Sequence, residues 1–253
     1  FSEIDCTGKT VMPGFIDSHT HLVHAGSRAD EYEMKIQGKS YEEIANAGGG
    51  IAATVKAVRK STKTELLKIS EKRLRNFIKY GTTTLEAKSG YGLDVKNELK
   101  LLEVINVLSR KNKFGVDILP TFLGAHSIPT GISKKEYIDI VCYEMIPQVA
   151  KRRLAVFIDI FCEKGYFDAK DTEHILSIGA KFGMIPKVHT DQFYSIGGIG
   201  AAKKVKAISV DHLEVLNQKG INQLKGTDII ATLLPGCSYF LNMVYPSARK
   251  LIE

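Results

Sequence analysis

The chain has 253 residues, of which 44% are hydrophobic, so it is long enough to bury the core of one large domain. Its formal net charge of +7 comes mainly from lysines spread along presumed helix surfaces, and no arginine-rich segment interleaves with aromatic residues. This pattern argues against a nucleic-acid partner and remains compatible with a small anionic substrate.

The four cysteines lie far apart and form no CxxC pair, which argues against a zinc ribbon or a disulfide framework. No segment approaches the roughly 20 apolar residues of a membrane span, and no leader-like segment opens the chain. We therefore expect no membrane partner and a cytoplasmic location.

Seven strand-like apolar runs alternate with segments of helical period along nearly the whole chain. This alternation predicts parallel strands joined by crossover helices. The predicted strands are 14–17, 82–87, 116–122, 154–161, 185–189, 207–211 and 229–234. Two of the helices between them have clear apolar stripes, one over 101–108 and one over 138–149.

Polar residues fall at the carboxyl ends of many different strands, which favours a (β/α)8 TIM-like barrel over a doubly wound sheet. Only seven strands can be counted before the sequence ends at Glu253, and an eighth is missing. The opening residues also read as the tail of an earlier element. We therefore predict a fragment that stops before strand 8, with the barrel over 13–253.

The segment Met12–Leu22 carries an HxH pattern, His19-Thr20-His21, beside an apolar run. Alternate residues of a strand point to one face, so the two imidazoles converge. Phe15 and Ile16 predict that the strand is buried. Converging imidazoles in this context favour a metal site over a solvent-exposed pair.

Two further histidines occupy similar strand ends, His189 and His212. His189 completes a set of three neutral nitrogen ligands that would leave room for a water molecule. His212 could be a further ligand, a general base or an orienting partner, and we favour an acid–base or orienting role. Asp211 beside it is expected to point to the opposite face if the strand continues.

Four other residues follow strands and therefore border the same predicted pocket. Arg28 could hold a carboxylate through its planar fork, although a solvated loop arginine is the alternative. Tyr91, between two glycines, could hydrogen-bond a ligand or simply pack the barrel rim. His126 ends the third strand, and Gln192 offers both a donor and an acceptor, which suits an amide or an imidazole-like group.

These motifs resemble the amidohydrolase superfamily and, within it, enzymes that open the cyclic amide of an imidazolone carrying a propanoate group. The HxH pattern marks only the superfamily, whereas the other segments are typical of those enzymes. The segments that carry the resemblance are 13–22 with 26–28, 88–93, 121–126, 189–193 and 211–213.

The resemblance implies a metal-dependent hydrolase barrel preceded by a small β-domain, of which residues 1–12 would be a remnant. It implies one zinc or iron ion on the three imidazoles, a propanoate grip by Arg28, and a small anionic substrate. Tyr91, His126 and Gln192 would contact the ring, and His212 would face the attacking water. A homodimer is expected by analogy alone.

We predict His212 and Gln192 as the catalytic positions, although Gln192 cannot act as a carboxylate base as the glutamate of many relatives does. The family's last metal ligand, an aspartate after strand 8, is absent from this sequence. The predicted fourth strand has no lysine to bridge two ions, which favours one metal. Two alternatives stay open: another deaminase or cyclic amidase of the superfamily, and a barrel without catalytic activity.

Overall fold

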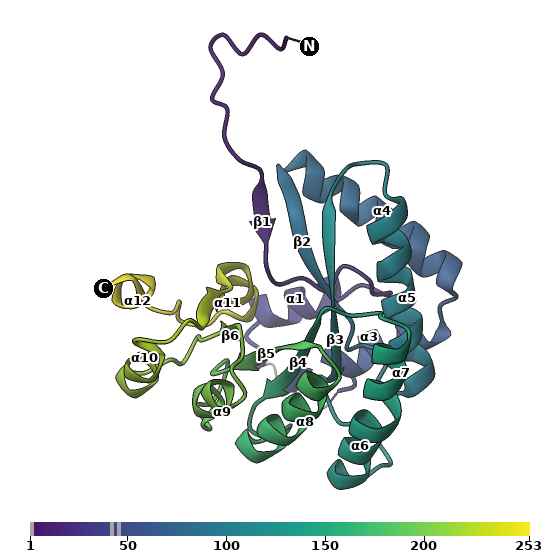
Figure 1. Cartoon of the computed structure of the whole chain (residues 1–253), viewed down its shortest axis with the longest axis vertical. Coiled ribbons are helices and arrows are strands. Elements are labelled where there is room, and N and C mark those ends of the chain that lie inside the picture. Colours follow the sequence, from purple (N-terminus) through teal and green to yellow (C-terminus); the bar gives the residue numbers. More distant parts are fainter. Residues whose placement is uncertain (1–2, 41–42, 45–46) are drawn as a thin grey trace.

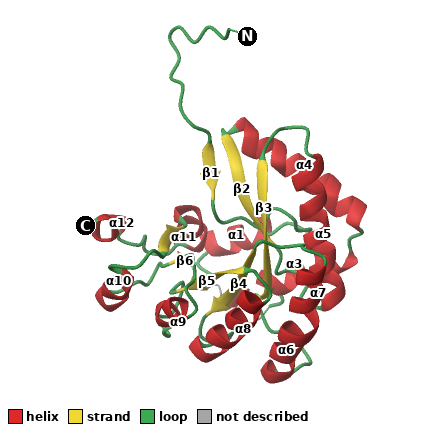
Figure 2. Cartoon of the chain, viewed as in Figure 1, coloured by secondary structure: helices red, strands yellow, loops and turns green. Residues whose placement is uncertain are grey.

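The computed structural model describes residues 3–40, 43–44 and 47–253. Seven parallel strands form a curled sheet whose spatial order follows the chain, and helices pack on its outer face (Figures 1 and 2). The strands are β1 (Phe15–Asp17), β2 (Thr82–Lys88), β3 (Asp117–Ala125), β4 (Phe157–Cys162), β5 (Ile185–Thr190), β6 (Ser209–His212) and β7 (Ile230–Leu233). All seven predicted strands are confirmed, and the largest differences are in β3, which extends to Ala125, and β4, which begins only at Phe157.

The helices connect successive strands, as expected for parallel pairing. Between β1 and β2 are α1 (Ala29–Ile36), α3 (Gly50–Lys60) and α4 (Lys63–Lys79), and between β2 and β3 is α5 (Val95–Lys111). After β3 come α6 (Lys134–Ile140), the π-helical turn η1 (Val141–Met145) and α7 (Ile146–Lys151). The remainder are α8 (Ala169–Lys181), α9 (Gly198–Lys204), α10 (Gln218–Leu224), α11 (Pro235–Leu241) and α12 (Ala248–Ile252).

Local sequence signals explain where several helices begin. Thr62 and Glu65 form a capping box at α4, in which each side chain accepts a hydrogen bond from the other residue's backbone N–H. The apolar stripe of α5 is buried and packs against β3. The stripe over 138–149 forms three consecutive helical pieces instead of one helix, because Pro147 has no N–H to continue the hydrogen-bond ladder.

The two outer strands of the sheet differ from the inner ones. Phe15 and Ile16 in β1 are 56% and 72% exposed, so the prediction of a buried first strand is wrong. Among the described residues β1 pairs with β2 alone and β7 pairs with β6 alone, so one side of each lacks a neighbouring strand. A cleft of about 510 Å³ separates β1 from the end of β7.

The segment before β1 lies away from the sheet (Figure 1). Residues 3–14 contain no strand and are exposed, so the described part of the predicted β-domain remnant has no sheet structure of its own.

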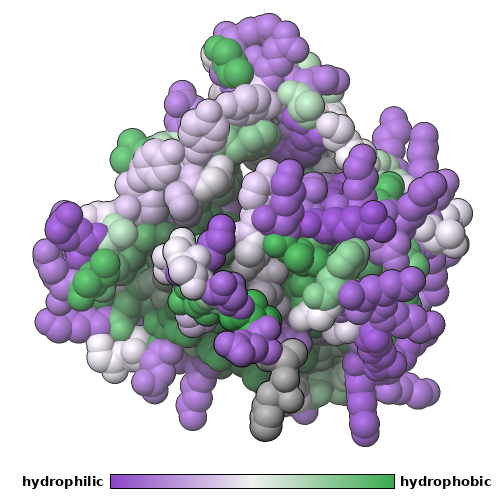
Figure 3. All heavy atoms as spheres, turned by 90° about the horizontal axis from the view of Figure 1, so that it is seen from above, coloured by the Kyte–Doolittle hydropathy of each residue, from purple (hydrophilic) through white to green (hydrophobic). Residues whose placement is uncertain are grey.

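The lysines of α3 and α4 lie on the outside of the molecule, as their spacing predicts. Figure 3 shows hydrophilic side chains projecting around the periphery of the face seen from above. The exposed lysines of α3 and α4 include Lys56, Lys60, Lys63, Lys68, Lys72 and Lys79. In the part of the chain that the structure describes, no helix combines the length and the apolar character that a bilayer crossing requires.

Candidate active site

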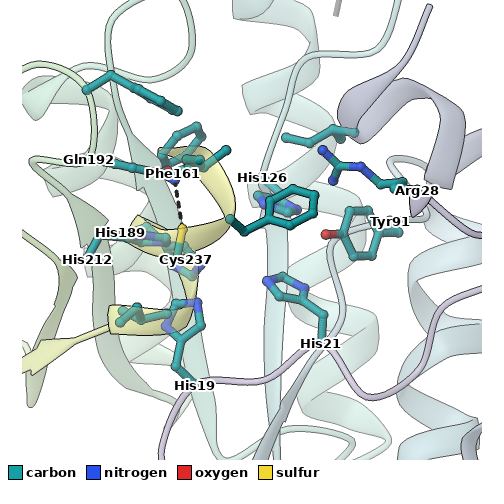
Figure 4. A pocket seen from close by; sticks show the side chains of 15 residues that line it. His19, His21, Arg28, Tyr91, His126, Phe161, His189, Gln192, His212 and Cys237 are labelled. Carbon is teal, nitrogen blue, oxygen red and sulfur yellow. Dashed lines mark hydrogen bonds between the residues drawn. The ribbon is translucent and has the colours of Figure 1, made fainter. Parts of the chain in front are cut away.

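A cavity of about 240 Å³ lies at the carboxyl ends of the strands (Figure 4). The structure brings all eight predicted site residues together on its wall, although they come from six separate segments of the chain. These residues are His19, His21, Arg28, Tyr91, His126, His189, Gln192 and His212. Parallel strands whose polar ends converge produce such a pocket in barrel folds.

Three imidazoles meet on one side of the cavity. One ligand atom each from His19, His21 and His189 can be chosen so that all lie within 4.8 Å of one another. His21 Nδ1 and His189 Nε2 are buried and have no hydrogen-bond partner among the described residues. Buried nitrogens without partners are costly unless a cation or water satisfies them, so this donor set fits a metal ion.

A carboxylate supports two of the imidazoles from behind, those of His19, just after β1, and His189 in β5. His19 Nδ1 donates to Asp211 Oδ2 at 2.7 Å, and His189 Nδ1 lies 2.9 Å from Asp159 Oδ2. Carboxylates in this position fix the ring orientation and leave the other nitrogen available to a cation.

The position of Asp211 corrects the sequence prediction. Asp211 and His212 were expected on opposite faces, yet both serve this site. The reason is that regular strand geometry ends here: His212 has φ of 89° and Leu213 has φ of 67°. Positive φ at two non-glycine residues redirects the chain, so simple alternation fails.

Beneath the imidazoles lies a buried group of five charged residues, which we call the floor network: Glu86, Lys88, Asp159, Lys187 and Asp211. Lys88 Nζ lies 2.6 Å from Asp159, 2.8 Å from Glu86 and 3.5 Å from Asp211. Lys187 Nζ lies 3.3 Å from Glu86 and 3.6 Å from Asp211.

Mutual pairing keeps the centre of the floor network ionised. Burial alone would raise the pKa of Asp159, but the charges of His189 and Lys88 hold that pKa well below its usual range. Burial would likewise lower the pKa of Lys88, but its three carboxylate neighbours raise it above the ordinary value. The network therefore presents fixed charges to the imidazoles above it.

The four other predicted residues that line the pocket, Arg28, Tyr91, His126 and Gln192, are together called the rim. Figure 4 shows Arg28 and Tyr91 across the pocket from Gln192. Arg28 Nε donates to Glu31 Oε2 at 2.8 Å, which orients the guanidinium from the start of α1.

The loop that carries Tyr91 is shaped by a buried carboxylate. Glu98 accepts hydrogen bonds from the backbone N–H groups of Gly90, Gly92 and Leu93 at 2.7–3.0 Å. Burial raises the pKa of Glu98, although these hydrogen bonds oppose the shift. The buried Glu98 carboxylate thus stabilises the tight Lys-Ser-Gly-Tyr-Gly turn through these hydrogen bonds.

His126 also belongs to the rim. Its Nδ1 donates to Gly90 O at 3.0 Å, and its ring stacks on His21 with centroids 5.0 Å apart. Burial, strengthened by repulsion from neighbouring imidazoles, lowers the pKa of His126 to about 3. The ring is therefore uncharged near neutral pH.

His212 differs from the other imidazoles in its charge. Burial alone would lower its pKa, but the neighbouring Cys237 and Glu214 side chains outweigh that effect and raise the pKa to about 9. Gln192 Nε2 also donates to Cys237 Sγ, at 3.4 Å. Sequence reasoning missed Cys237 and Glu214, although the position of Cys237 just after the seventh predicted strand could have drawn attention to it.

Comparison with known proteins gives the family context. A sequence model described as the amidohydrolase family matches residues 2–73. The imidazolonepropionase of Christiangramia forsetii is 48% identical over 99% of this chain, and that of Flavobacterium johnsoniae is 45% identical over 100%. By sequence, the chain is similar to these imidazolonepropionases over nearly its whole length.

The match to these imidazolonepropionases covers 61% of the length of each, so the chain spans less than two thirds of those relatives. Among solved structures, an adenine deaminase from Arthrobacter aurescens has a TM-score of 0.65 at 13% identity, covering 91% of this chain and 75% of that protein. A guanine deaminase from C. acetobutylicum has a TM-score of 0.60 at 13% identity, covering 95% and 58%. These likenesses concern the fold alone, and they agree with the predicted α/β architecture of parallel strands and crossover helices.

Proposed function

We propose that the protein is a metal-dependent hydrolase that opens the cyclic amide of 4-imidazolone-5-propanoate to N-formimidoyl-L-glutamate. The observation that carries the proposal is the placement of Arg28 across one cavity from three converging imidazoles. A guanidinium suits a carboxylate, and the imidazole cluster suits a cation that activates water. The names of the most similar sequences support the same substrate.

In this proposal His19, His21 and His189 hold one zinc or iron ion. When bound, such a cation polarises a carbonyl group and generates hydroxide from water near neutral pH. Asp211 and Asp159 keep the rings of His19 and His189 in place through their Nδ1 atoms.

The remaining residues bind and orient the substrate. Arg28 pairs with the propanoate, while Tyr91, His126 and Gln192 contact the ring. His212 holds the attacking water and moves a proton toward the ring nitrogen as the carbon–nitrogen bond breaks. The neutral ring of His126 favours contact with an uncharged imidazolone over a cation.

A deaminase of the same fold is the competing function, since adenine and guanine deaminases share the architecture. Such an enzyme would act on an uncharged nucleobase and would have no need of a carboxylate clamp. Arg28 on the cavity wall therefore favours the imidazolone substrate.

The test combines metal analysis with a substrate assay on purified protein that has been stripped with chelator and reloaded. We expect about one equivalent of metal that depends on the three imidazoles, and metal-dependent consumption of 4-imidazolone-5-propanoate. His189→Ala should lose this equivalent, whereas His174→Ala, which changes an exposed histidine of α8, should keep it. Failure of the parent protein to bind metal would contradict the metal site, and metal binding without turnover would contradict the substrate.

A further inference from the structure

A second cluster of metal-ligating side chains lies beside the three imidazoles. His212 ends β6, Glu214 follows two residues later, and Cys237 lies in the first turn of α11. One ligand atom from each can be chosen so that all three lie within 4.8 Å of one another. Figure 4 shows the Cys237 sulfur facing this part of the pocket, near His212 and Gln192.

Two atoms of this cluster lack hydrogen-bond partners. His212 and Glu214 are 6% and 7% exposed. His212 Nδ1 and Glu214 Oε2 make no hydrogen bond within the described residues, and they lie 3.5 Å apart. In this ion pair the ring carries a proton, and a divalent ion bound to both atoms would take the place of that proton.

The other contacts hold the cluster open toward the cavity. Ser238 Oγ donates to the second carboxylate oxygen of Glu214, Oε1, at 3.3 Å. Gln192 Nε2 donates to Cys237 Sγ from the pocket side. These contacts orient the carboxylate and the thiol without occupying Glu214 Oε2 or His212 Nδ1.

We propose that His212, Glu214 and Cys237 form a second cation site, separate from the three-imidazole site and selective for thiophilic divalent ions such as Zn²⁺. One thiolate, one imidazole and one carboxylate are all established zinc ligands. Neighbouring ligands of a tetrahedral zinc ion lie roughly 3–4 Å apart, so the cluster needs only a small contraction to bind. Binding releases two protons to solvent, one from the Cys237 thiol and one from the protonated His212 ring, because the thiolate and the neutral imidazole are the ligands.

The site has a regulatory consequence that rests on the proposed function. A cation held by His212 occupies the ring that would otherwise hold the attacking water and move the proton. Excess zinc should therefore inhibit turnover, while the ion on the three imidazoles remains bound. The cation site itself depends only on the geometry of the cluster and not on the proposed reaction.

Cobalt titration of the chelator-stripped protein tests the proposal, because Co²⁺ substitutes for zinc and absorbs in the near ultraviolet when a thiolate binds it. We expect about two equivalents to bind, with the sulfur band developing with only one of them. Cys237→Ser should abolish the band and remove about one equivalent. The matched control Cys6→Ser, which removes an exposed thiol, should leave both unchanged.

His189→Ala separates this site from the first. The variant should lose the equivalent of Co²⁺ that binds without a sulfur band and keep the equivalent that produces the band. Failure of the three-imidazole site and failure of the second site therefore give different results. Absence of the band from the parent protein, or its persistence in Cys237→Ser, would overturn the proposal. Glu214→Gln provides an independent check: it should weaken the band-forming equivalent at least tenfold, and unchanged affinity would remove Glu214 from the site.

Discussion

Buried groups of the floor network and the buried His126 ring of the rim reach different charge states. In the floor network the carboxylates of Asp159 and Asp211 stay ionised because Lys88 and the imidazoles lie against them. On the rim, His126 has no comparable carboxylate partner, and burial keeps it neutral. The difference shows that charge in this pocket is decided by the partner that a group meets and not by burial alone.

The largest expected effect comes from removing the Lys88 ammonium, the positive charge at the centre of the floor network. Lys88→Met leaves three buried carboxylates without their shared partner, so we expect a loss of about 3–5 kcal/mol in the free energy of unfolding. Urea denaturation measures it. Lys56→Met, which changes an exposed lysine of α3, should stay within about 0.5 kcal/mol of the parent. A Lys88→Met protein as stable as the parent would show that the network does not depend on its lysine.

The rim should respond in binding instead of stability. Arg28→Gln removes the guanidinium, and we expect KM for the imidazolone substrate to rise about 10- to 100-fold, as loss of a charged hydrogen bond predicts. The metal content should stay the same, because Arg28 is not among the three histidines that are proposed to bind the metal. Arg75→Gln, on the exposed side of α4, should leave KM unchanged. Loss of metal in Arg28→Gln would contradict the division between the two regions.

The dependence of the free energy of unfolding on pH should show a smaller difference between His126 and the floor network. The folded pKa of His126, about 3, is below the unfolded value of roughly 6.5, so its neutral form contributes stability that is lost as pH falls below 6.5. Asp159 and Asp211 of the floor network have lowered pKa values, so their contribution is lost only as pH falls below about 4. In metal-free protein we expect His126 to account for about 1–2 kcal/mol between pH 6.5 and pH 5.

Chemical denaturation across that pH range measures the slope. His126→Gln should flatten the decline above pH 5 and leave the steeper decline below pH 4 in place. An unchanged slope above pH 5 in this variant would mean that His126 is not the group that titrates there.

Much of this architecture is predictable from sequence because its causes are local. Apolar runs separated by helical stripes reveal all seven strands, and residues at strand ends converge in any parallel barrel. This is why His19, His189 and Arg28, far apart in the chain, were predicted in one pocket that the structure then brings together.

The missed features depend on backbone geometry and on distant packing. The orientation of Asp211 follows from positive φ at His212, which strand alternation cannot reveal. The floor role of Lys88 requires carboxylates from other strands, and none of them forms a local motif with it. Cys237 reaches the pocket because α11 packs back toward α1, where Tyr239 and Tyr32 share a hydrogen bond.

The two outer strands have a consequence for how the protein behaves in concentrated solution. β1 and β7 expose apolar side chains, and Ile16 and Ile230 are 72% and 61% exposed. Exposed apolar surface promotes association. Self-association through these side chains should therefore increase with protein concentration, and the positive charge of the lysine-covered helices should oppose it most effectively at low ionic strength.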